Sequence, residues 1–364
     1  MNGLANPYSA VKVFHHKEVL DALERNKHIA PFYIRLKPTN FCNHHCAYCT
    51  YGSGDTHQKT ENRDSVEYRD MIPWEKLQEI ITDIGNMGVK ALTFSGGGEP
   101  LTYPHIVDAA EKLREYGIDL SLITNGQLLR GKRAEAFAAA KWVRISFDAP
   151  LASVYSSLRR IPETSFHKVC ENIRSFAQNK DKDCVLGVNF VISKANCDYV
   201  YEAAALLKEL GADNVKFAAV VENQPHYHLD IKDKVIEQLH RAQEELSVPS
   251  GEHAFRIVNN YEYDWMDKNF TTQPFETCYT CRLITIIAAD QRVYLCHTRA
   301  YDSQAVVGDL HNQSFREMWF SEQTKKRLNA LQPKRDCRNF CVYEERNLLI
   351  QSYFDTDMRH VNFI

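Results

Sequence analysis

Between residues 73 and 246 the apolar positions switch repeatedly between two spacings, which predicts a regular succession of helices and strands. In residues 73–87 leucine and isoleucine recur every three or four positions and a glycine follows, as expected where a helix ends. Short, almost wholly apolar runs separate the helical segments. The expected strands are 32–37, 89–94, 118–123, 142–147, 185–192 and 215–221, and the expected helices are 17–25, 73–87, 105–116, 133–140, 166–179, 199–210 and 232–246.

Strands that alternate with helices form parallel βαβ units with right-handed connections. Six units are too few for a closed eight-stranded barrel, so the pattern predicts an α/β fold, a partial (β/α)6 TIM-like barrel over residues 32–250. Residues 1–31 are expected to form an N-terminal extension. Ligands in such folds bind at the carboxyl ends of the strands, which is where a site is expected.

Residues 251–364 follow a different pattern, which indicates a second, smaller domain. Two apolar runs, 283–289 and 292–295, flank Asp290-Gln291 and predict a β-hairpin. Residues 314–331 predict a single helix with Ser314 as its N-cap.

The overall composition argues against several classes of function. The chain has 364 residues, 44% hydrophobic and 25% charged, and a formal net charge of −3, so nothing indicates nucleic-acid or anionic-membrane binding. There is no apolar run of membrane-spanning length and no signal-peptide pattern. We therefore expect a cytoplasmic protein that binds neither nucleic acid nor membrane.

Cysteine is the residue type that departs most from an ordinary globular protein. Of eleven cysteines, three lie together at Cys42, Cys46 and Cys49. Five more lie near the end of the chain, at Cys278, Cys281, Cys296, Cys337 and Cys341. In a reducing compartment, clusters of this kind are read as metal ligands rather than as a disulfide framework.

The first cluster has the spacing C-x3-C-x2-C and follows the expected strand 32–37. Three thiolates can bind three irons of a [4Fe–4S] cluster, which leaves the fourth iron open to another ligand. A zinc site completed by His44 or His45 is the alternative. Other polar segments, Ser95 to Pro100 and Thr124 to Gly126, follow the next strands and are expected at the same edge.

With an aromatic residue before its third cysteine, C-x3-C-x2-C resembles the motif of the radical S-adenosylmethionine (SAM) superfamily. The resemblance implies a [4Fe–4S] cluster on Cys42, Cys46 and Cys49, with SAM chelating the fourth iron. It also implies cleavage of SAM to a 5′-deoxyadenosyl radical that abstracts hydrogen from a substrate C–H bond. The segment Ser95-Gly-Gly-Gly-Glu-Pro100 is similar to the family's GGEP turn. The cofactor-binding residues implied by the resemblance are Tyr48, Gly97, Gly98, Glu99, Ser146, Arg160 (with Arg159 as a competitor) and Asn189.

The second cysteine cluster resembles the auxiliary-cluster extensions called SPASM and twitch domains. Five cysteines suffice for one complete auxiliary [4Fe–4S] cluster, as in the twitch type. Cys296 and Cys341 are the firmest ligands, completed by Cys278 and Cys281, while a competing set replaces Cys281 with Cys337. A structural zinc site remains an alternative. Gln291 departs from the family pattern, which has glycine at this position.

The resemblance implies a radical SAM oxidoreductase supplied with electrons by a flavodoxin or ferredoxin. The expected reaction is a dehydrogenation-type modification of a small molecule such as a sugar or aminocyclitol. The alternatives are a maturase that cross-links or epimerises a ribosomal peptide, a GTP-cyclising enzyme, and a non-catalytic iron–sulfur electron-transfer protein. Glu222, at the expected end of the sixth strand, is a candidate substrate contact.

Overall fold

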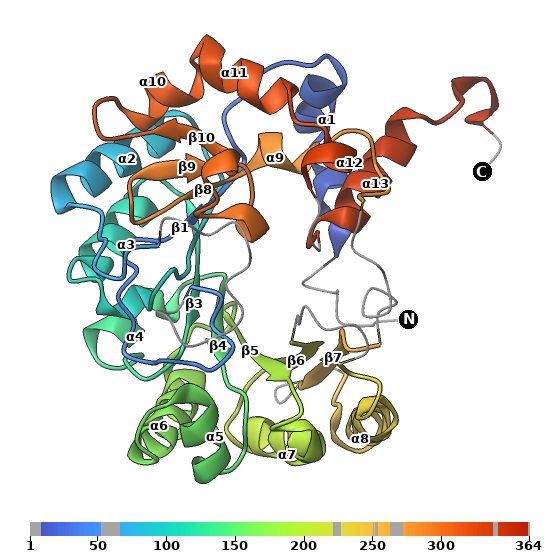
Figure 1. The fold of residues 1–364 in the computed structure, drawn as a ribbon. Coiled ribbons are helices and arrows are strands. Elements are labelled where there is room, and N and C mark those ends of the chain that lie inside the picture. The colour runs from blue at the N-terminus through green and yellow to red at the C-terminus, as the bar shows by residue number, and fades with distance from the viewer. Residues whose placement is uncertain are drawn as a thin grey trace.

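The computed structural model describes residues 9–51, 66–220, 227–249, 251, 254–262, 272–337 and 341–362. Within these ranges one ten-stranded sheet runs through the molecule in the order β10-β9-β8-β1-β2-β3-β4-β5-β6-β7 (Figure 1). The strands are β1 (Tyr33–Leu36), β2 (Ala91–Phe94), β3 (Asp119–Thr124), β4 (Trp142–Ser146), β5 (Val185–Ile192), β6 (Asn214–Ala219), β7 (Arg256–Asn259), β8 (Ile284–Ile287), β9 (Arg292–Tyr294) and β10 (Val306–Asp309).

Strands β1 to β7 are parallel neighbours and form a curved, open wall, whereas β9 pairs antiparallel with β8 and β10. The expected α/β partial barrel is thereby confirmed. Two strands are additional to the expectation: β7 extends the wall beyond β6, and β10 flanks the hairpin. Because β7 continues the barrel sheet past residue 250, the domain boundary placed there remains a prediction.

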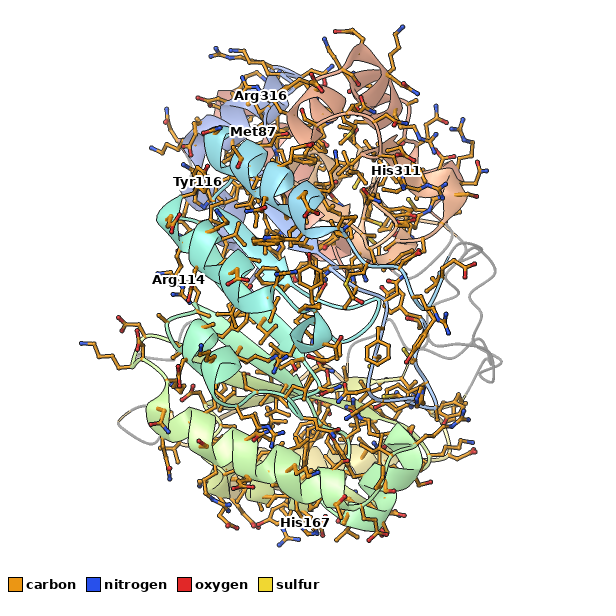
Figure 2. The ribbon with its side chains drawn as sticks, turned by 90° about the vertical axis from the view of Figure 1, so that its left-hand side faces the viewer. Met87, Arg114, Tyr116, His167, His311 and Arg316 are labelled. Carbon is orange, nitrogen blue, oxygen red and sulfur yellow. The ribbon has the colours of Figure 1, made fainter. Side chains whose placement is uncertain are left out.

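In the described part of the chain, seven helices cover the outer face of the wall (Figures 1 and 2). They are α2 (Trp74–Asn86), α3 (Ile106–Glu115), α4 (Lys132–Ala138), α5 (Ala152–Arg159), α6 (Thr164–Asn179), α7 (Val200–Glu209) and α8 (Lys232–Leu246). Helix α1 (Lys17–Glu24) instead packs against the start of β8 through Val19 and Leu23. The remaining α-helices are α9 (Thr280–Leu283), α10 (Phe315–Trp319), α11 (Glu322–Asn329), α12 (Pro333–Asp336) and α13 (Glu344–Phe354). Short 3₁₀ turns include η1 (Ala10–His15), η2 (Pro100–Thr102) and η3 (Cys197–Tyr199).

Alternate residues of each barrel strand face opposite sides, and this division positions the site. In β1, Ile34 and Leu36 are fully buried towards the helices, while Tyr33 and Arg35 between them are only partly buried. In β4 the same alternation buries Val143 and Ile145. The helix-facing residues therefore make the apolar core, and the other face of the wall lines the barrel interior.

Several expected helix ends agree with the structure and others do not. Ser314 caps α10 as expected, accepting a hydrogen bond from the backbone N–H of Glu317. The single helix expected over residues 314–331 is wrong, because Ser321 caps a second helix by accepting from the backbone N–H of Thr324. Helix α5 was not expected from the sequence.

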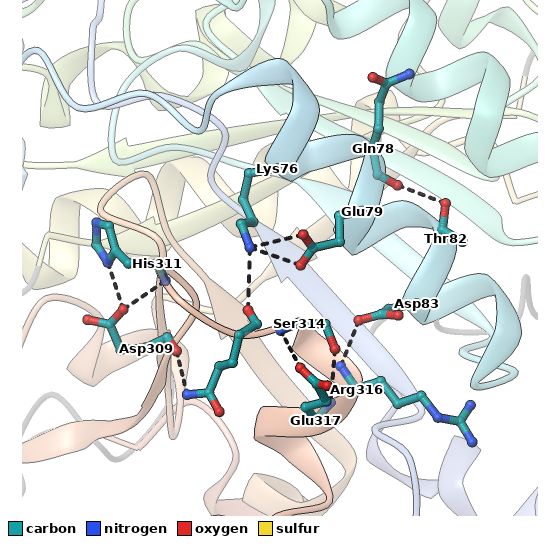
Figure 3. A network of polar contacts seen from close by, with 11 residues as sticks. Lys76, Gln78, Glu79, Thr82, Asp83, Asp309, His311, Ser314, Arg316 and Glu317 are labelled. Carbon is teal, nitrogen blue, oxygen red and sulfur yellow. Dashed lines mark hydrogen bonds and ion pairs between the residues drawn. The ribbon is translucent and has the colours of Figure 1, made fainter.

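The C-terminal region is joined to the barrel both through the sheet and through its helices. Strand β8 pairs in parallel with β1, from Tyr33 opposite Ile284 to Leu36 opposite Ile287. On the outer surface, Asp83 of α2 accepts a hydrogen bond from the backbone N–H of Arg316 at 2.8 Å, and Lys76 donates to the carbonyl of Gln313 (Figure 3). The two parts are therefore one continuous body.

The hairpin turn contains a conformational departure at Gln291. Its φ is +58°, in the left-handed region that costs most residues about 1 kcal/mol or more and that glycine enters readily. Gln291, which stands where the family pattern has glycine, therefore lies at a position where a side chain is unfavourable. No helix among the described residues combines the length and apolar character needed to cross a bilayer.

Candidate active site

The loop after β1 holds three free, half-buried cysteines: Cys42, Cys46 and Cys49. The backbone N–H of His45 donates to the carbonyl of Arg159 at 3.0 Å, and that of Ala47 donates to the carbonyl of Leu158 at 2.9 Å. The end of α5 therefore holds the middle of the cysteine loop. This anchor was not visible in the sequence, where α5 was not expected.

The glycine-rich turn after β2 packs directly against the cysteine loop. The backbone N–H of Gly98 donates to the carbonyl of Thr39 at 3.0 Å, and that of Glu99 donates to the carbonyl of Phe41 at 2.9 Å. A Cβ added at Gly98 would lie 2.0 Å from the carbonyl oxygen of Phe41. Glycine is therefore required here because two backbones approach within contact distance.

The carboxylate of Glu99 is buried and joins three segments of the site. It accepts hydrogen bonds from Leu101 N at 3.0 Å, Thr124 Oγ1 at 2.6 Å and Asn125 N at 2.7 Å. Burial raises the pKa of Glu99, and these hydrogen bonds offset only part of the rise. Asn125 in turn donates to Asn43 Oδ1 at 2.8 Å, so the ends of β2 and β3 are fixed to the cysteine loop.

A buried ion pair lies beneath the cysteines. Asp148 and Arg159 are paired with side chains 1% and 4% exposed, and Asp148 also accepts hydrogen bonds from Tyr48 Oη and from Val191 N. The guanidinium of Arg159 lies 3.6 Å from Cys46 Sγ. Burial raises the pKa of Tyr48 far above its usual value, so its hydroxyl remains a donor to Asp148.

The neighbouring Arg160, unlike Arg159, is not part of the buried site. It is exposed, and its φ of +52° places it at the end of α5, beyond the buried face that carries Tyr155, Leu158 and Arg159. Of the two competing arginines, Arg159 is the one beside the cysteine loop.

Ser146 and Asn189 were both expected at the barrel mouth, and the structure places them side by side. They are opposite residues of the parallel strands β4 and β5, and both are half-buried. The glycine turn, the cysteine loop and these two side chains all lie at the carboxyl edge of the sheet, as the fold predicts. Glu222 lies outside the described residues.

Two residues of this site were missed in the sequence. Lys37 is fully buried, donates to the carbonyl of Gly96 at 2.5 Å and lies 3.9 Å from the ring centroid of Tyr51. Tyr301, from the C-terminal region, hydrogen-bonds to Asn40 Oδ1. A lysine directly after an apolar strand was the available signal for the first, whereas Tyr301 is 261 residues from its partner and left none.

A second centre lies in the C-terminal region, where five cysteines line one cavity of about 30 Å³. They are Cys278, Cys281, Cys296, Cys337 and Cys341. Arg299 also lines this cavity and forms a buried ion pair with Asp302 at 2.7 Å. All five candidates are therefore brought together, and the cavity does not by itself separate the two ligand sets.

Both cysteine groups suit an iron–sulfur cluster in their chemistry. Thiolates are the ligands such clusters use, and all eleven cysteines are free. Burial raises the pKa of the Cys42 thiol to about 12, so metal binding there must displace a proton. Among the described residues, no three His, Cys, Asp or Glu side chains lie close enough together to hold one metal ion. An iron–sulfur cluster does not require this, because each of its cysteines binds a different iron.

Comparison with known proteins gives two family matches. The model described as "Radical SAM superfamily" matches residues 36–221, and the one described as "Iron-sulfur cluster-binding domain" (SPASM) matches residues 278–342. The AdoMet-dependent heme synthase of Methanosarcina barkeri is 23% identical over 332 residues, covering 87% of this chain and 90% of its own length. A GTP 3′,8-cyclase of Limosilactobacillus fermentum is 31% identical over 132 residues, covering 35% of this chain and 37% of its own length.

Two solved structures share the fold. Streptococcus suis SuiB, bound to precursor peptide SuiA, has a TM-score of 0.61 at 15% identity, covering 90% of this chain and 73% of its own. The protein anSMEcpe, with bound AdoMet and Kp18Cys peptide, has a TM-score of 0.57 at 16% identity, covering 89% and 97%. With its family matches and the cysteine loop on a partial barrel, this chain belongs to the radical SAM superfamily and carries a C-terminal SPASM iron–sulfur cluster-binding domain.

Proposed function

We propose that Cys42, Cys46 and Cys49 hold the SAM-binding [4Fe–4S] cluster of this radical SAM enzyme. One observation carries the assignment: three free cysteines share a single loop that α5 and the glycine turn hold from two sides. Bound together, the cluster and SAM supply one-electron cleavage of the cofactor and removal of hydrogen from a substrate C–H bond.

The protein's own contribution is to position and enclose the cofactor. We assign the turn Gly97-Gly98-Glu99 to its methionine amino group, since the glycines bring backbone carbonyls into reach. The carboxylate of Glu99 holds that turn in place through Thr124 and Asn125. Ser146 and Asn189 provide polar contacts from the floor of the site.

For the cofactor carboxylate, Arg159 is supported better than Arg160. It is buried beside Cys46, and Asp148 fixes its direction. Tyr48, bound to the same aspartate, is assigned to the adenine side of the site. Arg160 remains a prediction from the family resemblance. Its side chain is exposed, so replacing Arg160 tests its role without disturbing the buried pair of Asp148 and Arg159.

In the C-terminal domain we propose one auxiliary [4Fe–4S] cluster on Cys278, Cys281, Cys296 and Cys341, with Cys337 replacing Cys281 in the alternative set. The common cavity supports a single centre. Cys281 is nearly fully buried, and its thiol donates to the carbonyl of Cys278 at 3.1 Å. Cys337 is less buried and lies beside Arg299.

The proposed reaction is a redox modification of a small molecule, with electrons from a flavodoxin or ferredoxin. The AdoMet-dependent heme synthase, whose alignment covers 87% of this chain, supports a small-molecule substrate. Maturation of a ribosomal peptide is the second candidate, favoured by the fold shared with two proteins solved with bound peptides.

Anaerobic reconstitution tests the first assignment. With dithionite and SAM, wild-type protein is expected to form 5′-deoxyadenosine, measured by liquid chromatography and mass spectrometry. Cys46→Ala is expected to abolish it, whereas Cys170→Ala, in helix α6, serves as the matched control. If intact, iron-loaded wild type forms no product, the enzyme assignment fails; if Cys46→Ala retains product, the ligand assignment fails.

Metal analysis tests the second centre. Iron and sulfide are expected at about eight per chain, and Cys296→Ala is expected to lower both by about half while keeping the first cluster. Zinc in place of iron at the C-terminal cysteines would contradict the auxiliary-cluster proposal. Cys281→Ala and Cys337→Ala, compared directly, decide between the two ligand sets, because only the true ligand lowers the iron content.

A further inference from the structure

The barrel interior contains a cavity of about 660 Å³, within the usual range of small-ligand sites. Its wall is the inner face of the sheet, including Arg35 of β1, Ser121 of β3 and Arg144 of β4. The N-terminal segment contributes Lys12, and the C-terminal region contributes Arg346. Parts of the chain distant in sequence therefore close around one space.

The charged side chains that line this cavity are mostly positive. Five lysines and arginines line it, whereas Asp119 is the single carboxylate among the described lining residues. That carboxylate is 57% exposed and lies 3.6 Å from Lys141. The cations that line the cavity are Lys12, Arg35, Lys141, Arg144 and Arg346.

Arg35 and Arg144 lie within the wall rather than at its rim. Each stands between two fully buried apolar residues of its strand, Ile34 and Leu36 in one case and Val143 and Ile145 in the other. Strands buried on both faces are ordinarily almost continuously apolar. The inner face of these strands departs from that pattern, and Arg35 is hydrogen-bonded to Tyr343, another residue of the cavity lining.

Lys216 is a further cation near these two arginines, although it does not line the cavity. It lies on β6, opposite Asn189 of β5. Burial, with Arg144 and Arg35 nearby, lowers the pKa of Lys216 to about 8. Neighbouring positive charges of this kind repel one another, and an anion between them removes that cost.

Neutral donors complete the wall. Tyr33 Oη, Thr93 Oγ1 and Ser121 Oγ form a chain across three strands, with distances of 2.6 Å and 2.5 Å, and all three residues line the cavity. Hydroxyl groups can turn to donate to an oxyanion. Guanidinium groups with hydroxyl neighbours are the usual recognition chemistry for phosphate and carboxylate groups.

The cavity and the proposed SAM site are built on the same strands, although none of the residues assigned to SAM lines the cavity. Arg144 precedes Ser146 by two positions in β4, which corresponds to roughly 7 Å along an extended strand. Arg35 lies close enough to Tyr51, two residues after Cys49, for the tyrosine to affect its pKa.

We propose that this cavity binds an anionic group of the substrate, a phosphate or a carboxylate, through Arg35 and Arg144. The inference rests on the proposed function, because it assigns the substrate's chemical class. Its prediction is a small molecule anchored by its negative end at the barrel interior, with the reacting C–H bond nearer the carboxyl edge.

The test measures binding without turnover. Calorimetry on the anaerobic, cluster-loaded enzyme, at constant ionic strength and without reductant, compares pyrophosphate with succinate. We expect wild type to bind at least one, and Arg35→Gln and Arg144→Gln each to weaken it about tenfold or more. Arg316→Gln, which removes an exposed guanidinium on α10 and keeps the backbone contact to Asp83, is expected to bind within twofold of wild type.

Each outcome is decisive. Preference for pyrophosphate indicates a phosphate-bearing substrate, and preference for succinate a carboxylate-bearing one. If wild type binds neither probe, or if Arg316→Gln weakens binding as much as Arg144→Gln, the proposal is overturned. Should Arg144→Gln not fold, Arg144→Lys keeps the charge and is expected to bind more weakly than wild type; equal binding would also overturn it. If reconstituted wild-type protein forms no 5′-deoxyadenosine, the proposed function is refuted instead, whatever the result for anion binding.

Discussion

Replacing Asp148 with asparagine is expected to destabilise the protein and to disturb the SAM site at once. The substitution leaves the guanidinium of Arg159 buried without its counter-charge, since the two side chains are 1% and 4% exposed. It also weakens the acceptors for Tyr48 and for the backbone N–H of Val191. All three partners belong to elements that surround the cysteine loop.

The magnitude follows from the burial of the pair. Removing one member of a buried ion pair costs roughly 3–5 kcal/mol. For a chain of 364 residues, the unfolding entropy is about 0.76 kcal/mol/K. The expected loss in the midpoint of thermal unfolding is therefore about 4–7 °C.

Scanning calorimetry on the anaerobic holoprotein measures this loss, with Glu209→Gln as the matched control. Glu209 pairs with Arg174 at 3.4 Å, but both side chains are exposed, so little change is expected. The double variant Asp148→Asn/Arg159→Met removes both charges and is expected to lose less than Asp148→Asn alone. Equal losses in Asp148→Asn and Glu209→Gln, or strictly additive losses in the double variant, would refute the reasoning.

Three further predictions concern single positions. Gly98→Ala is expected to lower 5′-deoxyadenosine formation more than tenfold, because its Cβ meets the backbone of the cysteine loop, whereas Gly117→Asn, at a left-handed position with open space, is expected to be near wild type. Sulfate binding, measured by calorimetry, is expected to weaken as the pH rises through about 8, because Lys216 loses its proton there while the nearby Arg35 and Arg144 stay charged; a flat profile in wild type would contradict this. Gln291→Gly is expected to stabilise the protein by about 1 kcal/mol by relieving the positive φ, and a lowered unfolding midpoint would contradict that account.

The barrel was predictable because the local spacing of apolar residues differs between its strands and its helices. Each apolar run between amphipathic helices became a parallel strand. Helix α5 was missed because its eight residues include three serines and a valine, which have weak helix propensity. Because this helix was not expected, the sequence did not show which of its residues are buried. The choice between Arg159 and Arg160 could therefore not be made from the sequence.

The long-range parts of the site leave weaker local traces. The contacts of Tyr301 with Asn40, and of β8 with β1, join segments more than two hundred residues apart. The cations of the barrel interior did leave a signal, since Arg35, Arg144 and Lys216 each interrupt an apolar strand. Their convergence, however, depends on the register between strands, which no single strand encodes.

The parallel pairing of β1 with β8 means that the SPASM domain cannot be removed as a separable unit. A shortened chain that stops before Thr280 would leave the backbone of Tyr33 to Leu36 without its partner on that side. An unprotected strand edge of this kind invites pairing with another molecule, and so aggregation. The strand that delivers the cysteine loop would then become the least protected edge of the truncated barrel, so the two cysteine centres are expected to be inherited, and to be engineered, together.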